Sequence, residues 1–302
     1  MDDRTVTRRD ALRIGGAAAV AGIAGCSGGI GGSASATVYG QWTPEREGSG
    51  AEQGGESMRA MQPADLDENR HTLGDRYDLM AAFLEPPVPT MAFGELDSVY
   101  YNGGWTSSLY GVEAEFDQSA MVSAYQDELD AETVNSTYSG YELYRVDATL
   151  SSYLVGVADG RIAIAAAGDQ DRAAMESLID AREDDERRVS SDGPLASIQS
   201  AVGQESYTQV SIGDDVGIEV GETAPTAVAT GFSVADSEEE LLSITSGFVL
   251  PETVTDPEAA VEARVEADAS VGVLDYGDAD VSTESGVVVA TQERHVDDAL
   301  AF

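Results

Sequence analysis

The stretch YLVGVADGRIAIAAA, from Tyr153 to Ala167, carries the clearest structural signal in the 302-residue sequence. Tyr153–Ala158 is a continuous apolar run of the length that suits a buried strand. Asp159 and Gly160 form a two-residue turn of the kind that joins hairpin strands, and the residues that follow are apolar again. The sequence therefore predicts a buried antiparallel hairpin in the middle of the chain.

The segments around this hairpin predict a mixture of strands and helices. Asp117 is placed to cap a helix that runs to Leu129, with Met121 and Tyr125 on its apolar face. We expect strands at 110–116 and 141–146 and further helices from residue 171 and at 194–202.

The last third of the chain repeats this mixture. Asp256, Pro257 and Glu258 have the order of an N-cap, a first-turn proline and a first-turn acid, which predicts a helix to about residue 267. We expect strands at 224–234, 241–250, 271–274 and 287–291 and a closing helix at 295–300.

The order of strand, turn, strand and helix therefore occurs twice. We predict an α+β fold of two roughly 100-residue β-rich units, at 71–204 and 205–302, with helices packed on mainly antiparallel sheets. An internal duplication explains the repeat. A chance recurrence of a common β-β-α order explains it equally well.

The N-terminus reads as an export signal over residues 1–25. Four arginines precede an Ala- and Gly-rich apolar run of about 12 residues, too short for a membrane-spanning helix, which needs about 20. Thr7, Arg8, Arg9 and Leu12 resemble a twin-arginine signal, which implies the twin-arginine export machinery as a partner.

Cys26 is the single cysteine of the chain, so no disulfide can form within it. The sequence Ile23–Cys26 resembles a lipobox, which implies that Cys26 carries a two-chain lipid and anchors the protein at the outer face of the cytoplasmic membrane. The alternatives are an ordinary N-terminal helix with a buried cysteine and a signal peptide that is cleaved without lipidation.

Residues 26–70 are predicted to contain the lipid-attachment cysteine and a flexible tether, because Gly, Ser and Glu dominate this part of the chain. Val38–Pro44 is an apolar island within it. We favour a strand that returns to the folded domain over an exposed apolar spot on the linker.

The formal net charge is −40, from 56 acidic and 16 basic residues, and every basic residue is Arg. Self-repulsion opposes folding in dilute buffer, whereas at about 1 M salt the screening length falls to about 3 Å. This composition resembles that of haloarchaeal proteins. The alternative of a disordered acidic chain conflicts with 42% hydrophobic residues in periodic runs. The charge also argues against binding to nucleic acid.

Four segments, Trp42–Pro44, Gly140–Tyr144, Asp159–Ala165 and Gly231–Ser233, look like those of uncharacterised haloarchaeal lipoproteins exported by the twin-arginine route. They are more distantly similar to bacterial anchored proteins of unknown function. The resemblance extends over most of residues 38–292 and implies no activity.

Few residues suggest chemistry. The absence of Lys excludes a phosphate-binding-loop lysine and a Schiff base. His71 and His295 are predicted to be exposed structural histidines rather than members of a metal or acid–base pair.

Two weaker candidates remain in the sequence. Asp275, Asp278, Asp280 and Glu284 offer oxygen ligands for a metal such as Ca²⁺, but acidic clusters arise by default in so acidic a chain. Asn135, in the sequon Asn135–Thr137, is a candidate for glycosylation in a polar loop.

The sequence favours a non-enzymatic binding or structural module of the cell envelope, without a cofactor. The alternatives are a solute-binding component of a transporter, which needs a pocket with convergent polar groups, and a carboxylate-dependent hydrolase, which needs two buried carboxyls in one cleft.

Overall fold

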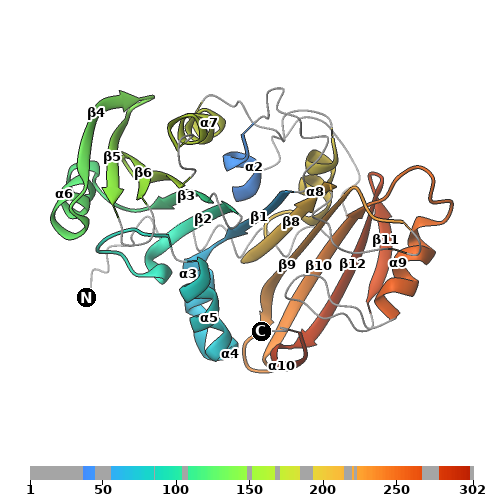
Figure 1. The fold of residues 1–302 in the computed structure, drawn as a ribbon. Helices are drawn as coiled ribbons and strands as arrows, with labels where there is room; N and C mark the ends of the chain where they lie inside the picture. Colours follow the sequence, from blue (N-terminus) through green and yellow to red (C-terminus); the bar gives the residue numbers. More distant parts are fainter. Residues whose placement is uncertain are drawn as a thin grey trace, which may run out of the picture. The chain divides into compact units, whose positions relative to one another are not determined.

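A computed structural model describes residues 37–44, 56–84, 86–103, 108–147, 152–166, 171–183, 193–213, 220, 223–266 and 279–299. Residues 36–302 belong to one compact unit. Its centre is a 12-stranded sheet in the order β11-β12-β10-β9-β8-β1-β2-β3-β7-β6-β5-β4, and every neighbouring pair is antiparallel. Figure 1 shows this sheet with helices on both sides. The prediction of an α+β fold with a mainly antiparallel sheet is confirmed.

The strands are short, as is usual for a twisted sheet. They are β1 (Glu56–Met61), β2 (Leu96–Gly103), β3 (Ser108–Ala114), β4 (Glu132–Tyr138), β5 (Tyr141–Asp147), β6 (Ser152–Ala158), β7 (Arg161–Ala166), β8 (Tyr207–Ile212), β9 (Ala227–Asp236), β10 (Leu241–Val249), β11 (Asp280–Glu284) and β12 (Val287–His295).

The helices are also short. They are α2 (Val38–Trp42), α3 (Pro63–Glu68), α4 (Arg70–Leu73), α5 (Asp75–Leu84), α6 (Gln118–Leu129), α7 (Asp171–Glu183), α8 (Pro194–Val202), α9 (Pro257–Glu266) and α10 (Val296–Ala299).

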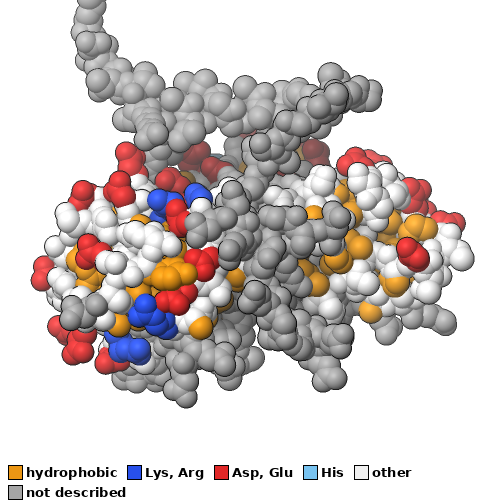
Figure 2. Space-filling model, turned by 90° about the horizontal axis from the view of Figure 1, so that it is seen from above, with side chains coloured by type: hydrophobic (Ala, Val, Ile, Leu, Met, Phe, Trp, Pro, Cys, Tyr) orange, Lys and Arg blue, Asp and Glu red, His pale blue; other side chains and the backbone are white. Residues whose placement is uncertain are grey.

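Successive residues of a strand point to opposite faces of the sheet, and here both sets include apolar side chains. Helices cover both faces and bury these side chains. One side, here called the α5 face, packs against α3, α4, α5, α6 and α10 and, at its other end, against α9. The opposite side, the α7 face, packs against α2, α7 and α8. Figure 2 looks onto the molecule from the side of α7 and shows many acidic and few basic side chains on the visible described surface.

The hairpin of β6 and β7 forms as predicted, and its strands are buried on both faces. The predicted helix caps also form. The Asp117 carboxylate accepts a hydrogen bond from the backbone N–H of Ala120 at the start of α6, and Asp256 accepts one from Ala259 at the start of α9. The predicted closing helix corresponds to α10.

The strands of both predicted units belong to one sheet, which the pairing of β1 with β8 joins. On one side of this junction, β1, β2 and β3 form a meander, α6 follows, and β7 returns to pair with β3. On the other side, β8, β9 and β10 form a meander, α9 follows, and β12 returns to pair with β10. The shared order is what a duplication would leave, with β4 and β5 as an extra hairpin in the first half.

The structure differs from the predicted tether over residues 26–70. α2, β1 and α3 all lie in this range, and β1 pairs on both edges, with β2 and with β8. Met58, Ala60 and Met61 are fully buried. The sequence of β1 mixes small, polar and apolar residues and so shows no clear strand pattern. Its stability comes from pairing with a strand on each edge.

The apolar island in that range is the helix α2 and not the predicted strand. Thr37 caps it by accepting a hydrogen bond from the N–H of Gly40, and Tyr39 and Trp42 are fully buried against the α7 face. Burial of two aromatic side chains one helical turn apart outweighs the β propensity of Val38 and Tyr39. The predicted strand at 271–274 lies outside the described residues.

Candidate functional site

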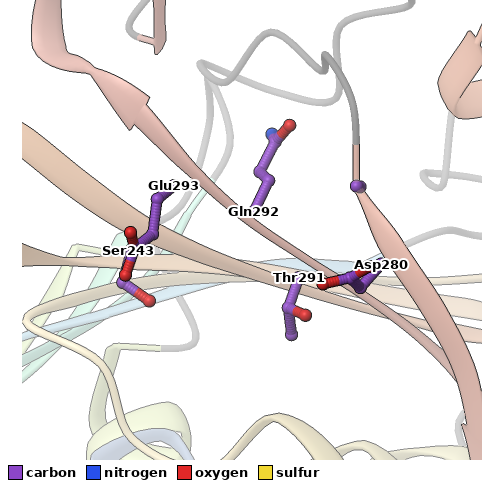
Figure 3. A pocket seen from close by; sticks show the side chains of 6 residues that line it. Ser243, Asp280, Thr291, Gln292 and Glu293 are labelled. Atoms are coloured by element: carbon purple, nitrogen blue, oxygen red, sulfur yellow. The ribbon is translucent and has the colours of Figure 1, made fainter.

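An open polar pocket lies where β10, β11 and β12 run side by side. Its volume is about 450 Å³, and its lining residues are Ser243, Ala279, Asp280, Thr291, Gln292 and Glu293. Figure 3 shows the side chains of five of them by label.

The sheet register brings these residues together. Ser243 of β10 lies directly opposite Glu293 of β12, and Thr291 lies directly opposite Asp280 of β11. Opposite residues point to the same face, which here is the α7 face. Gln292 points away from Thr291 in Figure 3, and its side chain is almost completely buried. The pocket thus presents two hydroxyls and two carboxylates from three adjacent strands.

A half-buried hydroxyl network adjoins the pocket through Thr245, which lies opposite Thr291 on one side and Gly231 on the other. Glu205 lies over Gly231, where a Cβ would come within 2.8 Å of the Glu205 Cγ. The Ser233 hydroxyl donates to Glu205 at 2.6 Å, and the Ser206 backbone N–H donates to Ser233 at 3.0 Å.

Burial raises the pKa of the Glu205 carboxyl, while hydrogen bonds from Ser233 and Thr245 partly oppose the rise. Among the described residues no Asp or Glu is fully buried, so the pair of buried carboxyls that a carboxylate-dependent hydrolase requires does not form in this part of the chain.

A second polar surface crosses the α5 face at the centre of the sheet. Directly opposite residues on six neighbouring strands form one row, here called the central row: Tyr110, Tyr101, Arg59, Gln209, Thr230 and Ser246. Apolar clusters adjoin it, one under α3, α5 and α6 and the other under α9.

Arg59 lies at the middle of the central row, on the strand pair that joins the two halves. Its guanidinium is 5.6 Å from the centre of the Tyr101 ring, and the rings of Tyr101 and Tyr110 are 4.9 Å apart at 51°. Burial raises the pKa of Tyr110 to about 12, an effect that Arg59 partly opposes. Burial also raises the pKa of Tyr207, whose hydroxyl donates to Gln209 at 3.3 Å, and again Arg59 opposes the rise.

The predicted metal ligands are separated or lie outside the described residues. Asp280 and Glu284 are at the two ends of β11, so they do not share a coordination sphere, and Asp275 and Asp278 are not described. Within the described ranges, no three His, Cys, Asp or Glu side chains gather in a way that could hold a metal ion.

Neither histidine lines the pocket. His71 is exposed in α4. His295 ends β12, where its Nε2 is 3.1 Å from a Glu240 carboxylate oxygen and its Nδ1 accepts a hydrogen bond from the backbone N–H of Asp297. These contacts stabilise the position of α10 at the end of the sheet.

Asn135 lies in the edge strand β4 and not in the predicted polar loop. The register with β5 shifts between Thr133 and Thr137, so the sequon falls at a bulge where the edge is irregular. Thr137 is exposed.

Arg8, Arg9 and Cys26 lie outside the described residues. No helix in the described part of the chain is both long enough and apolar enough to cross a membrane.

Sequence reasoning missed the pocket, the Glu205 network and the central row. The residues of each come from strands that pair only through the register of the whole sheet, and their local sequences hold isolated polar residues. The alternation of Thr291 and Glu293 with buried neighbours in β12 is the one local signal that two polar side chains share a face.

Comparisons with known proteins place this chain in no family. No protein-family description and no curated protein matches it. A solved structure, crystal form I of TP0453, is similar with a TM-score of 0.45 and 7% identity, over 82% of this chain and 91% of that one.

Proposed function

We propose that this chain is an exported, lipid-anchored and non-enzymatic binding module of the cell envelope of a halophile. Its pocket on β10, β11 and β12 would hold a small, neutral, hydroxyl-rich molecule such as a sugar. The pocket itself is the observation that carries the proposal, because hydroxyls and carboxylates from three adjacent, paired strands line it together.

The chemistry of the pocket favours such a ligand. The Asp280 and Glu293 carboxylates accept hydrogen bonds from ligand hydroxyls, while those of Ser243 and Thr291 both donate and accept. The two negative charges disfavour an anionic ligand.

Calorimetric titration of the full chain with a panel of neutral hexoses at high salt tests this proposal. We expect saturable binding of at least one hexose, and we expect Thr291→Val and Glu293→Gln each to weaken it about two- to tenfold, the value of one hydrogen bond. Glu252→Gln, on an exposed loop residue, is the matched charge control. Absence of saturable binding to wild type, or equal weakening by the control, would contradict the proposal.

The proposed anchor places the folded body close to the membrane. Nine residues lie between Cys26 and Ala36, the first residue of the compact unit, so ten Cα–Cα steps join them. A chain of that length reaches at most about 35 Å. We expect Cys26→Ser to release the protein from membranes and replacement of Arg8 and Arg9 by Lys to block export. Cell fractionation measures both, and unchanged membrane partition of Cys26→Ser would argue against lipidation.

A solute-binding component of a transporter is the second candidate, and the same pocket favours it. A transporter component differs from a simple binding module in having a protein partner in the membrane. Crosslinking of the ligand-loaded protein in intact cells would reveal such a partner. The proposed partners are the membrane, through the lipid on Cys26, and the export machinery.

A further inference from the structure

The central row is a polar feature between the apolar clusters of the α5 face, and its two halves differ. In the second half, Thr230 and Ser246 are 4% and 0% exposed, and the Ser246 hydroxyl donates to Thr230 at 3.1 Å. In the first half, Arg59, Tyr101 and Tyr110 are half-buried, so each keeps part of its surface exposed. The first half therefore keeps polar groups that a ligand could reach.

Arg59 differs from most other described arginines. Arg76, Arg161, Arg172 and Arg182 each form an ion pair with a carboxylate at 2.5 to 3.0 Å. Among the residues that the structure describes, no carboxylate forms such a pair with Arg59.

The contrast is informative because 56 acidic residues compete for only 16 basic ones. Carboxylates are abundant in this chain, yet the guanidinium at the centre of the sheet is bordered by Tyr101, Tyr207 and Gln209. A half-buried cation with no ion-pair partner among the described residues is poised to receive an anion from outside the protein.

The tyrosines define the rest of the surface. Tyr101 and Tyr110 lie on adjacent strands with their rings tilted against each other, and the Arg59 guanidinium lies over the first ring. Two aromatic rings next to one guanidinium supply both a stacking surface and a planar pair of donors.

We propose that Arg59, Tyr101 and Tyr110, with Gln209 at the border, bind a small carboxylate attached to a planar ring. The guanidinium would donate two parallel hydrogen bonds to the carboxylate, and the ring would stack on the tyrosines. This site is separate from the pocket on β10, β11 and β12, on the opposite face of the sheet, and does not rest on its function.

The ring is needed for a physical reason. At about 1 M salt the screening length is about 3 Å, so attraction at a distance is lost and chloride competes for the guanidinium. Contact hydrogen bonds and stacking survive, since neither acts beyond direct contact. A ligand that uses both the charge and the rings is therefore selected over a plain anion.

Four probes separate these contributions, titrated by ligand-observed NMR against the full chain in about 1 M KCl. Benzoate carries the ring and the carboxylate, acetate carries the carboxylate alone, benzyl alcohol carries the ring alone, and inorganic phosphate is an anion without a ring. We expect benzoate to bind at least about tenfold more tightly than each of the others. Equal binding of acetate or phosphate, or of benzyl alcohol, would overturn the proposal.

Variants assign the site. We expect Arg59→Gln, which installs the residue found opposite at Gln209, to weaken benzoate binding at least about tenfold. Arg172→Gln removes the same charge from the exposed surface of α7 and should leave binding unchanged. Glu293→Gln, in the other pocket, should also leave it unchanged, so the two sites are tested independently.

Two further measurements cover the case in which Arg59→Gln does not fold. Tyr101→Phe keeps the ring and should retain benzoate binding, whereas Tyr101→Leu should lose most of it. In the wild-type protein, benzoate ring protons should show nuclear Overhauser contacts with tyrosine ring protons. Absence of these contacts at saturating benzoate would overturn the proposal without any variant.

Discussion

At the scale of single residues, Trp42 is the largest fully buried side chain of the described structure. It comes from α2 and lies flat on β3, where Gly111 leaves room for its ring. A Cβ at Gly111 would fall 2.2 Å from the Trp42 Cδ2. Arg182 of α7 lies over the indole, 6.0 Å from the ring centre, so the ring is held between strand and helix.

We expect Gly111→Ala to destabilise the fold by about 1–3 kcal/mol, because the indole ring cannot move away without displacing α2 or α7. Gly156→Ala is the matched control. Gly156 is also a buried strand glycine on the same face, but its Cβ would meet only ordinary contacts at 3.4 Å. Chemical unfolding at high salt measures both, and equal effects of the two substitutions would contradict this account.

Glu205 gives a pH dependence. Because its pKa is raised in the folded protein, its contribution to stability is complete below the ordinary pKa of Glu and is lost as the pH rises through the higher folded value. Glu205→Gln removes the buried charge and retains an acceptor for Ser233. We therefore expect a greater gain in melting temperature at pH 7 than at about pH 4. Glu252→Gln should show no such difference, and a gain that is larger at the lower pH would refute the assignment.

At the scale of elements, α6 depends on a single capping side chain. The Asp117 carboxylate accepts hydrogen bonds from the Ser119 hydroxyl and from the Ala120 N–H, which together lower its pKa. The ionised cap therefore stabilises the folded state above the ordinary pKa of Asp, and this contribution is lost as the pH falls through the lowered value.

We expect Asp117→Ala to lower the melting temperature at pH 7, since the first turn of α6 loses its acceptor. The loss should shrink as the pH falls through the lowered pKa of the Asp117 carboxyl, because the wild-type side chain then becomes protonated. Asp117→Asn keeps an acceptor and should lie between wild type and Asp117→Ala at pH 7. A loss that does not change with pH would show that the charge of Asp117 does not contribute.

Elements that carry their own signal could be predicted from the sequence, and the others could not. The caps of α6 and α9 and the turn at Asp159 and Gly160 lie next to the elements they define, so each was predicted. β1 has no such signal, because it is stabilised by β2 and β8, which begin 35 or more residues away. α2 was predicted as a strand because its burial depends on Gly111 and α7, which its own sequence does not reveal.

The candidate sites follow the same rule. Ser243, Asp280 and Thr291 meet only once three strands are in register, and Arg59 acquires its tyrosine neighbours only through β2 and β3. The sequence of a single strand does not reveal which residues of a distant strand will lie opposite it. Both surfaces could therefore be recognised only from the folded sheet.

At the scale of the whole molecule, charge dominates. Few ion pairs form among the described residues, and exposed ones such as Arg70 with Asp78 contribute little against the self-repulsion of a net charge of −40. Self-repulsion across the unit falls steeply as the screening length drops from about 10 Å at 0.1 M salt to about 3 Å at 1 M.

We expect the chain without residues 1–25 to lose its native circular dichroism in dilute buffer and to regain it near 1 M salt. KCl and NaCl at equal ionic strength should act alike if screening is the cause. A specific need for one of these cations would point to ion binding, and a native spectrum in dilute buffer would contradict the salt requirement altogether.

The junction of β1 with β8 determines the order in which the chain can be completed during its synthesis. Every other strand pair joins residues within 56–166 or within 207–295, so each half can close its own ladders as it leaves the ribosome. One edge of β1 must wait for residues 207–212, on the order of ten seconds of translation. During that interval its free N–H and C=O groups form an open edge in a nascent protein. Newly made chains are therefore open to mispairing with one another at β1 until the second half has emerged.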